Sequence, residues 1–181
     1  GTLRESRTRA MTRTRVRVKD HGQVKHLELP PGWTPCPEDQ RTSGAYLKEF
    51  RSQESEDVKL SFYYRGQRIP RVAAEEFQNI LAHDAHELTT EELEQVEIVI
   101  RNASDEEYFS LSSSHTEDIN GKRILIVEGV WKTSGLADYG LFIDSDNTGS
   151  AVQEIHFLAP ERDYVNYIDQ IEQVLASIVW K

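Results

Sequence analysis

Apolar positions are densest in the last third of the chain, where three short apolar runs precede one long segment with helical periodicity. The runs span residues 122–131, 139–144 and 151–158. Each is rich in β-branched or aromatic residues and is bounded by residues that favour turns. In the first run Ile124 and Ile126 alternate with apolar neighbours, so both faces of a strand would be apolar. The pattern predicts three consecutive strands, with 122–131 in a central position and covered on both faces.

A long amphipathic helix is predicted at the C-terminal end. Pro160 suits the first turn of a helix, and apolar residues recur three and four positions apart after it. They are Tyr164, Tyr167, Ile168, Ile171, Val174, Leu175 and Ile178. This stripe predicts a helix that covers one face of the sheet.

Strict alternation marks the segment before residue 20. One face of a strand would carry Thr12, Thr14, Val16 and Val18, and the other would carry Arg13, Arg15, Arg17 and Lys19. Residues 20–23 favour a turn into a second strand at 24–29, which predicts a hairpin. An edge strand whose charges prevent aggregation explains the four cations, and a site for an anionic partner is the alternative.

The middle of the chain mixes strands and short helices. Strands are predicted at 46–50, 58–64 and 108–116, and another is expected to begin at 98–100. Pro70 opens a helix whose apolar stripe includes Val72. Thr89 and Glu92 form a capping box for a shorter helix through Val96.

Length and cysteine content limit the class of protein. The chain has 181 residues, about one domain by length, and its single cysteine, Cys36, excludes an intrachain disulfide. The apolar runs are shorter than the ~20 residues of a membrane-spanning helix, and the N-terminal residues lack a signal-peptide core. We therefore expect no membrane span and favour the cytoplasm, with an extracytoplasmic location open if a leader was removed.

Charge divides the chain at residue 20. Residues 1–20 carry a net charge of +5, whereas residues 21–181 carry −15. An acidic body repels nucleic-acid backbones, so no nucleic-acid binding is expected. We predict a basic arm or edge strand at 1–20 and a single domain at 21–181. The predicted interaction residues, facing a protein partner, are Arg13, Arg15, Arg17 and Lys19.

The loop after residue 143 imitates two kinds of site. Asp144, Asp146 and Thr148 match the nucleophile loop of haloacid-dehalogenase-type phosphatases, but the only downstream lysine is the terminal Lys181. The same loop begins like a calcium-binding EF-hand loop, but Ile155 stands where that loop needs a bidentate glutamate. A turn is the favoured interpretation of both patterns.

Histidines near the end of the first predicted helix could supply two metal ligands. His83 with His86 or Glu87 would share a helical face, but the sequence nominates no third ligand. A solvated helix end is the favoured interpretation, and we expect no metal and no cofactor.

Several short motifs resemble, in order, those of the PsbP-like superfamily. They are LELPPGW at 27–33, NGK at 120–122, GVW at 129–131 and FLAP at 157–160 before a tyrosine-rich helix. This superfamily includes photosystem extrinsic proteins, a transport factor that binds the Ran GTPase, and DcrB-like bacterial proteins. The resemblance implies an α+β fold in which an antiparallel sheet lies between helices (α/β/α) that begin near Arg71 and Pro160. It also implies a noncatalytic accessory or binding role.

Two classes of function remain open. The missing catalytic set favours a noncatalytic accessory protein that binds another protein, and not an enzyme. The alternative is a small-ligand-binding protein or an enzyme whose pocket only the fold creates. Glu128 and His156, expected on adjacent strands, are its candidate pocket residues, because titratable residues forced onto buried faces are typical of such sites. A structural pair between strands is the favoured interpretation of these two residues.

Overall fold

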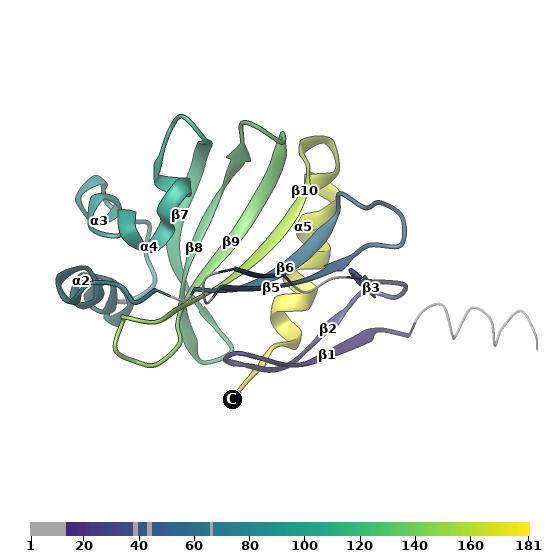
Figure 1. The fold of residues 1–181 in the computed structure, drawn as a ribbon, viewed down its shortest axis with the longest axis horizontal. Helices are drawn as coiled ribbons and strands as arrows, with labels where there is room; N and C mark the ends of the chain where they lie inside the picture. The colour runs from purple at the N-terminus through teal and green to yellow at the C-terminus, as the bar shows by residue number, and fades with distance from the viewer. Residues whose placement is uncertain (1–13, 38–39, 43–44, 66) are drawn as a thin grey trace, which may run out of the picture.

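A computed structural model describes residues 14–37, 40–42, 45–65 and 67–181, without the side chains of 40–42 and 45–46. The main sheet has eight strands and is antiparallel throughout (Figure 1). Its strands lie in the order β3 (Thr34–Pro35), β5 (Ala45–Arg51), β6 (Lys59–Tyr64), β10 (Val152–Pro160), β9 (Leu136–Asp144), β8 (Lys122–Trp131) and β7 (Phe109–Ile119), with β4 (Gln40–Thr42) paired to β5. This confirms the predicted antiparallel sheet and the inner position of β8.

A second, smaller sheet was not expected as a separate unit. It consists of β1 (Val16–His21), β2 (Val24–Leu29) and the short C-terminal strand β11 (Val179–Trp180). The predicted N-terminal hairpin is confirmed for residues 16–29, whereas Thr12 and Arg13 lie outside the described residues. Val18 on β1 is only 3% exposed, so the boundary expected at residue 20 cuts through a strand that belongs to the core.

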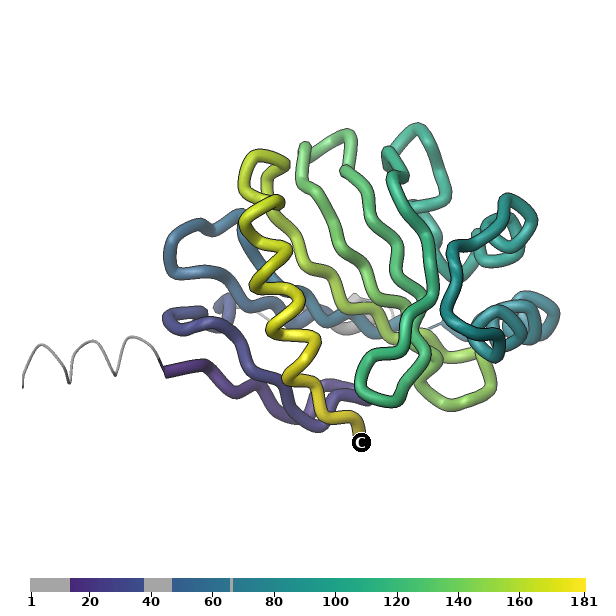
Figure 2. Tube along the Cα trace, turned by 180° about the vertical axis from the view of Figure 1, so that it is seen from behind, coloured from purple at the N-terminus to yellow at the C-terminus, as the bar shows by residue number. Residues whose placement is uncertain are grey.

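The helices cover both faces of the main sheet. They are α2 (Arg71–Ala82), α3 (Thr90–Gln95), α4 (Glu97–Ile100) with the 3-10 turn η1 (Arg101–Ser104), and α5 (Glu161–Ser177). On β8, Ile124 and Ile126 pack in the core beneath α5, whereas Leu125 and Val127 pack in the core beneath α2 and α4. The fold is therefore α+β with the sheet between helices, as expected. Figure 2 shows α5 crossing one face and ending beside the small sheet.

The turn between β7 and β8 holds the C-terminal end of α5. Asn120 adopts a positive φ of 51° and its Nδ2 donates hydrogen bonds to the carbonyl oxygens of Leu175 (2.9 Å) and Ile178 (2.8 Å). Trp180 Nε1 donates to the Ile119 carbonyl at 2.7 Å. The Asn120 amide thus adds a side-chain donor to carbonyls at the end of α5, and together with the Trp180 bond it fixes the chain end to the turn.

Two local predictions are wrong. Residues 98–100 belong to the helix α4 and not to a strand. The helix places Val99 and Ile100 in one core with Phe77, whereas in a strand these two neighbours would point to opposite faces. Val72 is 68% exposed and does not belong to the apolar stripe of α2, which buries Ala73, Ala74, Phe77 and Ile80. The capping box of Thr89 and Glu92 is confirmed, with both reciprocal hydrogen bonds present.

Candidate functional site

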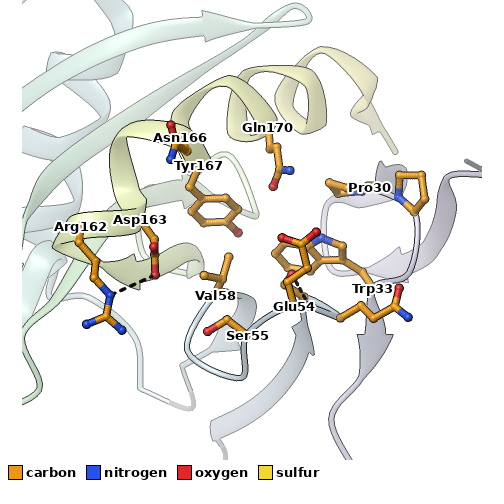
Figure 3. A pocket seen from close by; sticks show the side chains of 13 residues that line it. Pro30, Trp33, Glu54, Ser55, Val58, Arg162, Asp163, Asn166, Tyr167 and Gln170 are labelled. Carbon is orange, nitrogen blue, oxygen red and sulfur yellow. Dashed lines mark hydrogen bonds and ion pairs between the residues drawn. The ribbon is translucent and has the colours of Figure 1, made fainter. Parts of the chain in front are cut away.

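A cleft of about 650 Å³ opens between the start of α5, the β5–β6 turn and the loop after β2 (Figure 3). We call it the α5 cleft. Its walls are formed by Pro30, Pro31, Trp33, Ser52, Gln53, Glu54, Ser55, Val58, Arg162, Asp163, Asn166, Tyr167 and Gln170. Most of these side chains end in an amide, hydroxyl or charged group, so the cleft offers hydrogen bonds more than apolar area.

Two aromatic rings form the base of the α5 cleft. Trp33 and Tyr167 stack with ring centroids 5.8 Å apart and an interplanar angle of 15°, and each is 4% exposed. The Tyr167 hydroxyl donates to the Lys59 carbonyl at 3.1 Å, and burial raises the pKa of Tyr167. Because the hydroxyl is neutral and already bonded, Tyr167 serves as a fixed wall of the cleft.

The loop that carries Trp33 depends on Gly32. Gly32 has a φ of +83°, and a Cβ there would lie 2.2 Å from Gln53 Oε1. Glycine adopts this backbone conformation without strain, whereas a Cβ there would also displace the Gln53 side chain from the cleft wall. The PPGW motif of the sequence therefore builds the wall of the cleft that faces the β5–β6 turn.

Charged groups stand at the opening of the α5 cleft. Arg162 Nε lies 3.9 Å from Asp163 Oδ2, and Glu54 projects from the β5–β6 turn (Figure 3). Two further depressions adjoin this turn. The lining of one includes residues 52–56 and Gly32, and the lining of the other includes Asp57, Leu136 and Arg162. The concave surface thus extends beyond the α5 cleft on both sides of the turn, and the cleft itself is open and polar.

A second candidate is a network of buried charges on the opposite face of the sheet. His156 on β10 lies between two carboxylates, with Nδ1 2.8 Å from Asp138 Oδ2 and Nε2 2.9 Å from Glu154 Oε1. The side chains of Asp138 and Glu154 are 4% and 3% exposed. Trp131 Nε1 donates to Asp138 at 2.9 Å and closes this end of the network.

Two arginines complete the network through Glu154. Its Oε2 accepts from Arg65 Nε at 2.9 Å and from Arg101 at 2.8 Å. Arg65 is itself buried and also donates to the carbonyls of Ile98 and Val99. The network therefore joins β9 and β10 to the end of α4.

The carboxylates hold His156 in its charged form. Burial would lower the pKa of His156, but Asp138 and Glu154 outweigh it and raise that pKa to about 10. Burial would likewise raise the pKa of Glu154, but His156, Arg65 and Arg101 lower it to about 2. An imidazolium that is charged at neutral pH and has both nitrogens engaged cannot accept a further proton, so the network is unsuited to general-base chemistry there.

The structure does not bring the two predicted pocket residues together. β9 separates Glu128 on β8 from His156 on β10, so the expectation of adjacent strands is wrong. Glu128 faces α5, where its Oε1 accepts from the Tyr164 hydroxyl at 2.7 Å, whereas His156 faces the α2–α4 side with Phe142. Both side chains serve as structural partners within separate cores.

Of the predicted cations of the arm, Arg17 and Lys19 lie on the edge strand β1, and Arg15 directly precedes it. Arg15 and Arg17 lie 3.7 and 3.2 Å from the carboxylate of Glu28 on β2, and about half of each arginine side chain is exposed. Lys19 is exposed on the same strand, and Arg13 lies outside the described residues. Arg15 and Arg17 thus pair in part with the body of their own chain.

The motifs that imitated catalytic and metal sites form local contacts. Asp146 accepts from the backbone and hydroxyl of Thr148, and Asp144 accepts from Gly149 N, so this loop is a turn. His86 lies 2.9 Å from Glu92, which raises the pKa of His86. Within the described ranges no cluster of three or more His, Cys, Asp or Glu side chains could hold a metal ion.

Sequence reasoning missed the partners of His156 and the cleft itself. The spacing of Glu154 and His156, two apart on one strand, was the available signal, because residues i and i+2 share a face. Arg65 and Arg101 gave no signal, since only the tertiary fold brings them to Glu154. The cleft draws on three segments far apart in the sequence.

Comparison with known proteins identifies the fold. No protein-family model matches the chain, and no curated protein matches it. Among solved structures, the solution structure of cyanobacterial PsbP (CyanoP) from Synechocystis sp. PCC 6803 matches with a TM-score of 0.58, covering 93% of this chain and 94% of that chain at 12% identity. The fold is PsbP-like.

The PsbP-like fold accounts for the motifs seen in the sequence. NGK at 120–122 forms the turn that holds α5, and LPPGW at 29–33 leads from β2 to the aromatic base of the cleft. Both motifs thus have structural roles in the fold that the comparison shows. No helix in the described part of the chain is long and apolar enough to cross a membrane.

Proposed function

We propose that this PsbP-like protein is a noncatalytic binding protein whose α5 cleft receives a polar segment of a protein partner. One observation carries the proposal: the concave polar surface and the buried charge network of Asp138, Glu154 and His156 lie on opposite faces of the sheet. An enzyme site needs both in one place, because a substrate must reach the group that acts on it.

The form of the cleft supports a protein segment over a small molecule. Small-ligand pockets are mostly apolar and enclose their ligand. The α5 cleft is instead open, lined by groups such as Asn166 and Gln170, and continuous with depressions on either side of the β5–β6 turn. Such a surface suits an extended polar contact of the kind found in protein–protein interfaces.

Cys36 adds no support for an enzymatic alternative. Burial and the neighbouring Glu49 carboxylate raise the pKa of its thiol. The thiolate is the reactive form of cysteine, so a raised pKa disfavours nucleophilic catalysis.

Affinity capture from a native lysate tests the proposal. The baits are the intact chain, a chain lacking residues 1–13 and two single-residue variants, and the captured proteins are identified by mass spectrometry. Asn166→Arg fills the cleft, whereas Gln173→Arg adds the same charge at an exposed position of α5 outside it. We expect a partner that the intact and Gln173→Arg chains retain and the Asn166→Arg chain loses. Retention by Asn166→Arg, or loss only on removal of residues 1–13, would contradict the cleft as the binding site.

A further inference from the structure

A small apolar pocket lies at the edge of the main sheet, on the face opposite the α5 cleft. It has a volume of about 150 Å³ and lies between α3, α4, η1 and β7. We call it the β7 pocket. Its apolar walls are Leu93, Ile100, Ala103, Phe109 and Leu111. An apolar cavity of this volume accommodates one benzene-sized group, so the pocket fits a single apolar side chain.

Carboxylates surround the opening of the β7 pocket. Glu94, Glu97 and Glu106 line it and are exposed. Within the part of the chain that the structure describes, no cation pairs with any of the three. Three unpaired negative charges around one apolar depression favour a ligand that is apolar at its centre and basic at its flanks.

The strand beside the pocket is an edge strand with an uncovered stretch. β7 ends the sheet order, and residues 86–88 cover only its second half, where Leu88 N donates to the Ser114 carbonyl and Thr116 N donates to the His86 carbonyl. Ser110, Leu111 and Ser112 are exposed in the first half, and a bulge follows Leu111. An edge strand presents backbone groups with which an extended chain can pair.

Exposed apolar side chains cluster in the same segment. The described residues expose six large apolar side chains, of which Ile98, Tyr108 and Leu111 lie within residues 98–111. Isolated exposed apolar residues are ordinary on a protein surface, but Leu111 also lines the β7 pocket, so it extends the apolar wall of the pocket to the surface.

From these observations we infer that the β7 pocket binds an extended basic segment of a partner protein. One apolar side chain of that segment enters the pocket. The Lys or Arg residues on either side of it pair with Glu94, Glu97 and Glu106. The backbone of the segment lies along residues 110–112 of β7. A second copy of this chain is disfavoured as the occupant, because residues 21–181 carry a net charge of −15 and two acidic surfaces repel each other. This surface is independent of the α5 cleft and adds a second contact to the proposed function.

Selection from a displayed library of random linear peptides tests the inference directly. The bait is the full chain, and enriched sequences are synthesised and their affinity measured by fluorescence anisotropy. We expect enrichment of one apolar or aromatic residue flanked by Lys or Arg, with binding that weakens as salt increases. Failure to enrich this class, or enrichment of acidic peptides, would overturn the inference.

Matched variants locate the binding surface. Leu111→Glu should weaken the selected peptide at least tenfold, whereas Val165→Glu, which adds the same charge at a 75% exposed position of α5, should not. Replacing Glu94, Glu97 and Glu106 together by Gln should weaken binding about tenfold at low salt and reduce its salt dependence.

Two further outcomes would reject the proposed occupant. Equal binding by Leu111→Glu and the unmodified chain would place the peptide elsewhere. The full chain could instead associate with itself. If this association competes with the peptide and is lost when residues 1–13 are removed, the occupant is the chain's own basic arm.

Discussion

His156 shows how strongly a single residue is defined by its neighbours. Two carboxylates face its ring nitrogens, and two arginines balance the second carboxylate. A buried charge is tolerated only when it is paired and hydrogen-bonded, so each member of the network depends on the others. The network's energetic role is therefore tested by removing one member at a time.

Glu154→Gln should destabilise the protein by about 3–5 kcal/mol, because it leaves the buried Arg65 and the charged His156 without their common carboxylate. Denaturant unfolding measures this change. The control is Glu75→Gln, which removes an exposed pair with Arg71 on α2 and should cost less than ~0.5 kcal/mol. Similar costs for the two variants would show that the network contributes nothing beyond a surface pair.

His156 should also make the free energy of unfolding depend on pH. The pKa of His156 is about 10 in the folded chain, whereas its ordinary value, which applies to the unfolded chain, is 6.5. Between these two pH values the unfolded chain therefore binds fewer protons than the folded chain. The stabilisation is therefore complete below pH 6.5 and is lost as pH rises towards 10, by at most ~1.4 kcal/mol per pH unit.

Unfolding free energies measured from pH 6 to 10 should show this slope in the unmodified chain and not in His156→Gln. His83→Gln, an exposed histidine outside the network, should keep the slope. A slope that survives in His156→Gln would assign the pH dependence to other groups.

At the scale of elements, the β7–β8 turn determines how α5 ends. Asn120 combines a positive φ with hydrogen bonds to the carbonyls of Leu175, in the last turn of α5, and Ile178, the residue after the helix. Asparagine tolerates this conformation better than most residues and supplies the amide donors. The two contributions can be separated by two substitutions.

Asn120→Gly should cost about 1–2 kcal/mol, because it keeps the backbone conformation and loses only the hydrogen bonds. Asn120→Ala should cost about 1 kcal/mol more, because alanine is strained at a φ of 51°. Thermal and denaturant unfolding measure both variants. A neutral Asn120→Gly would mean that water replaces the side-chain donors at no cost.

Most elements were predictable because each has a clear local pattern. The runs at 122–131 and 151–158 are short, rich in β-branched residues and bounded by turn residues, which favours strands, and the apolar stripe of α5 has the period of a helix. Residues 98–100 were misassigned because a three-residue apolar run suits either element, and packing against Phe77 decides for a helix. The site was less predictable: His156 was identified, but strand order placed β9 between it and Glu128.

At the scale of the whole molecule, the N-terminal hairpin is part of the domain and not an appendage. Val18, Val24, Leu27 and Leu29 belong to the core that α5 shares with the main sheet. β2 also pairs with β11, so the two ends of the described chain meet in one small sheet. Truncation through residue 20 therefore removes core residues together with the cations.

Two truncations test this boundary. A chain beginning at residue 22 should be less stable than one beginning at residue 14, because only the first lacks β1 and the buried side chain of Val18. Thermal unfolding of both proteins measures the difference. Equal melting temperatures would show that β1 contributes little to the fold.

The three tryptophans stand in three different parts of the molecule. Trp33 lies at the base of the α5 cleft, Trp131 donates to the buried charge network, and Trp180 binds the β7–β8 turn. Indole fluorescence responds to the polarity around the ring, so single-tryptophan versions of the chain would give each region its own optical signal. Occupation of the cleft, protonation of the network and release of the chain end could then be followed separately in one protein.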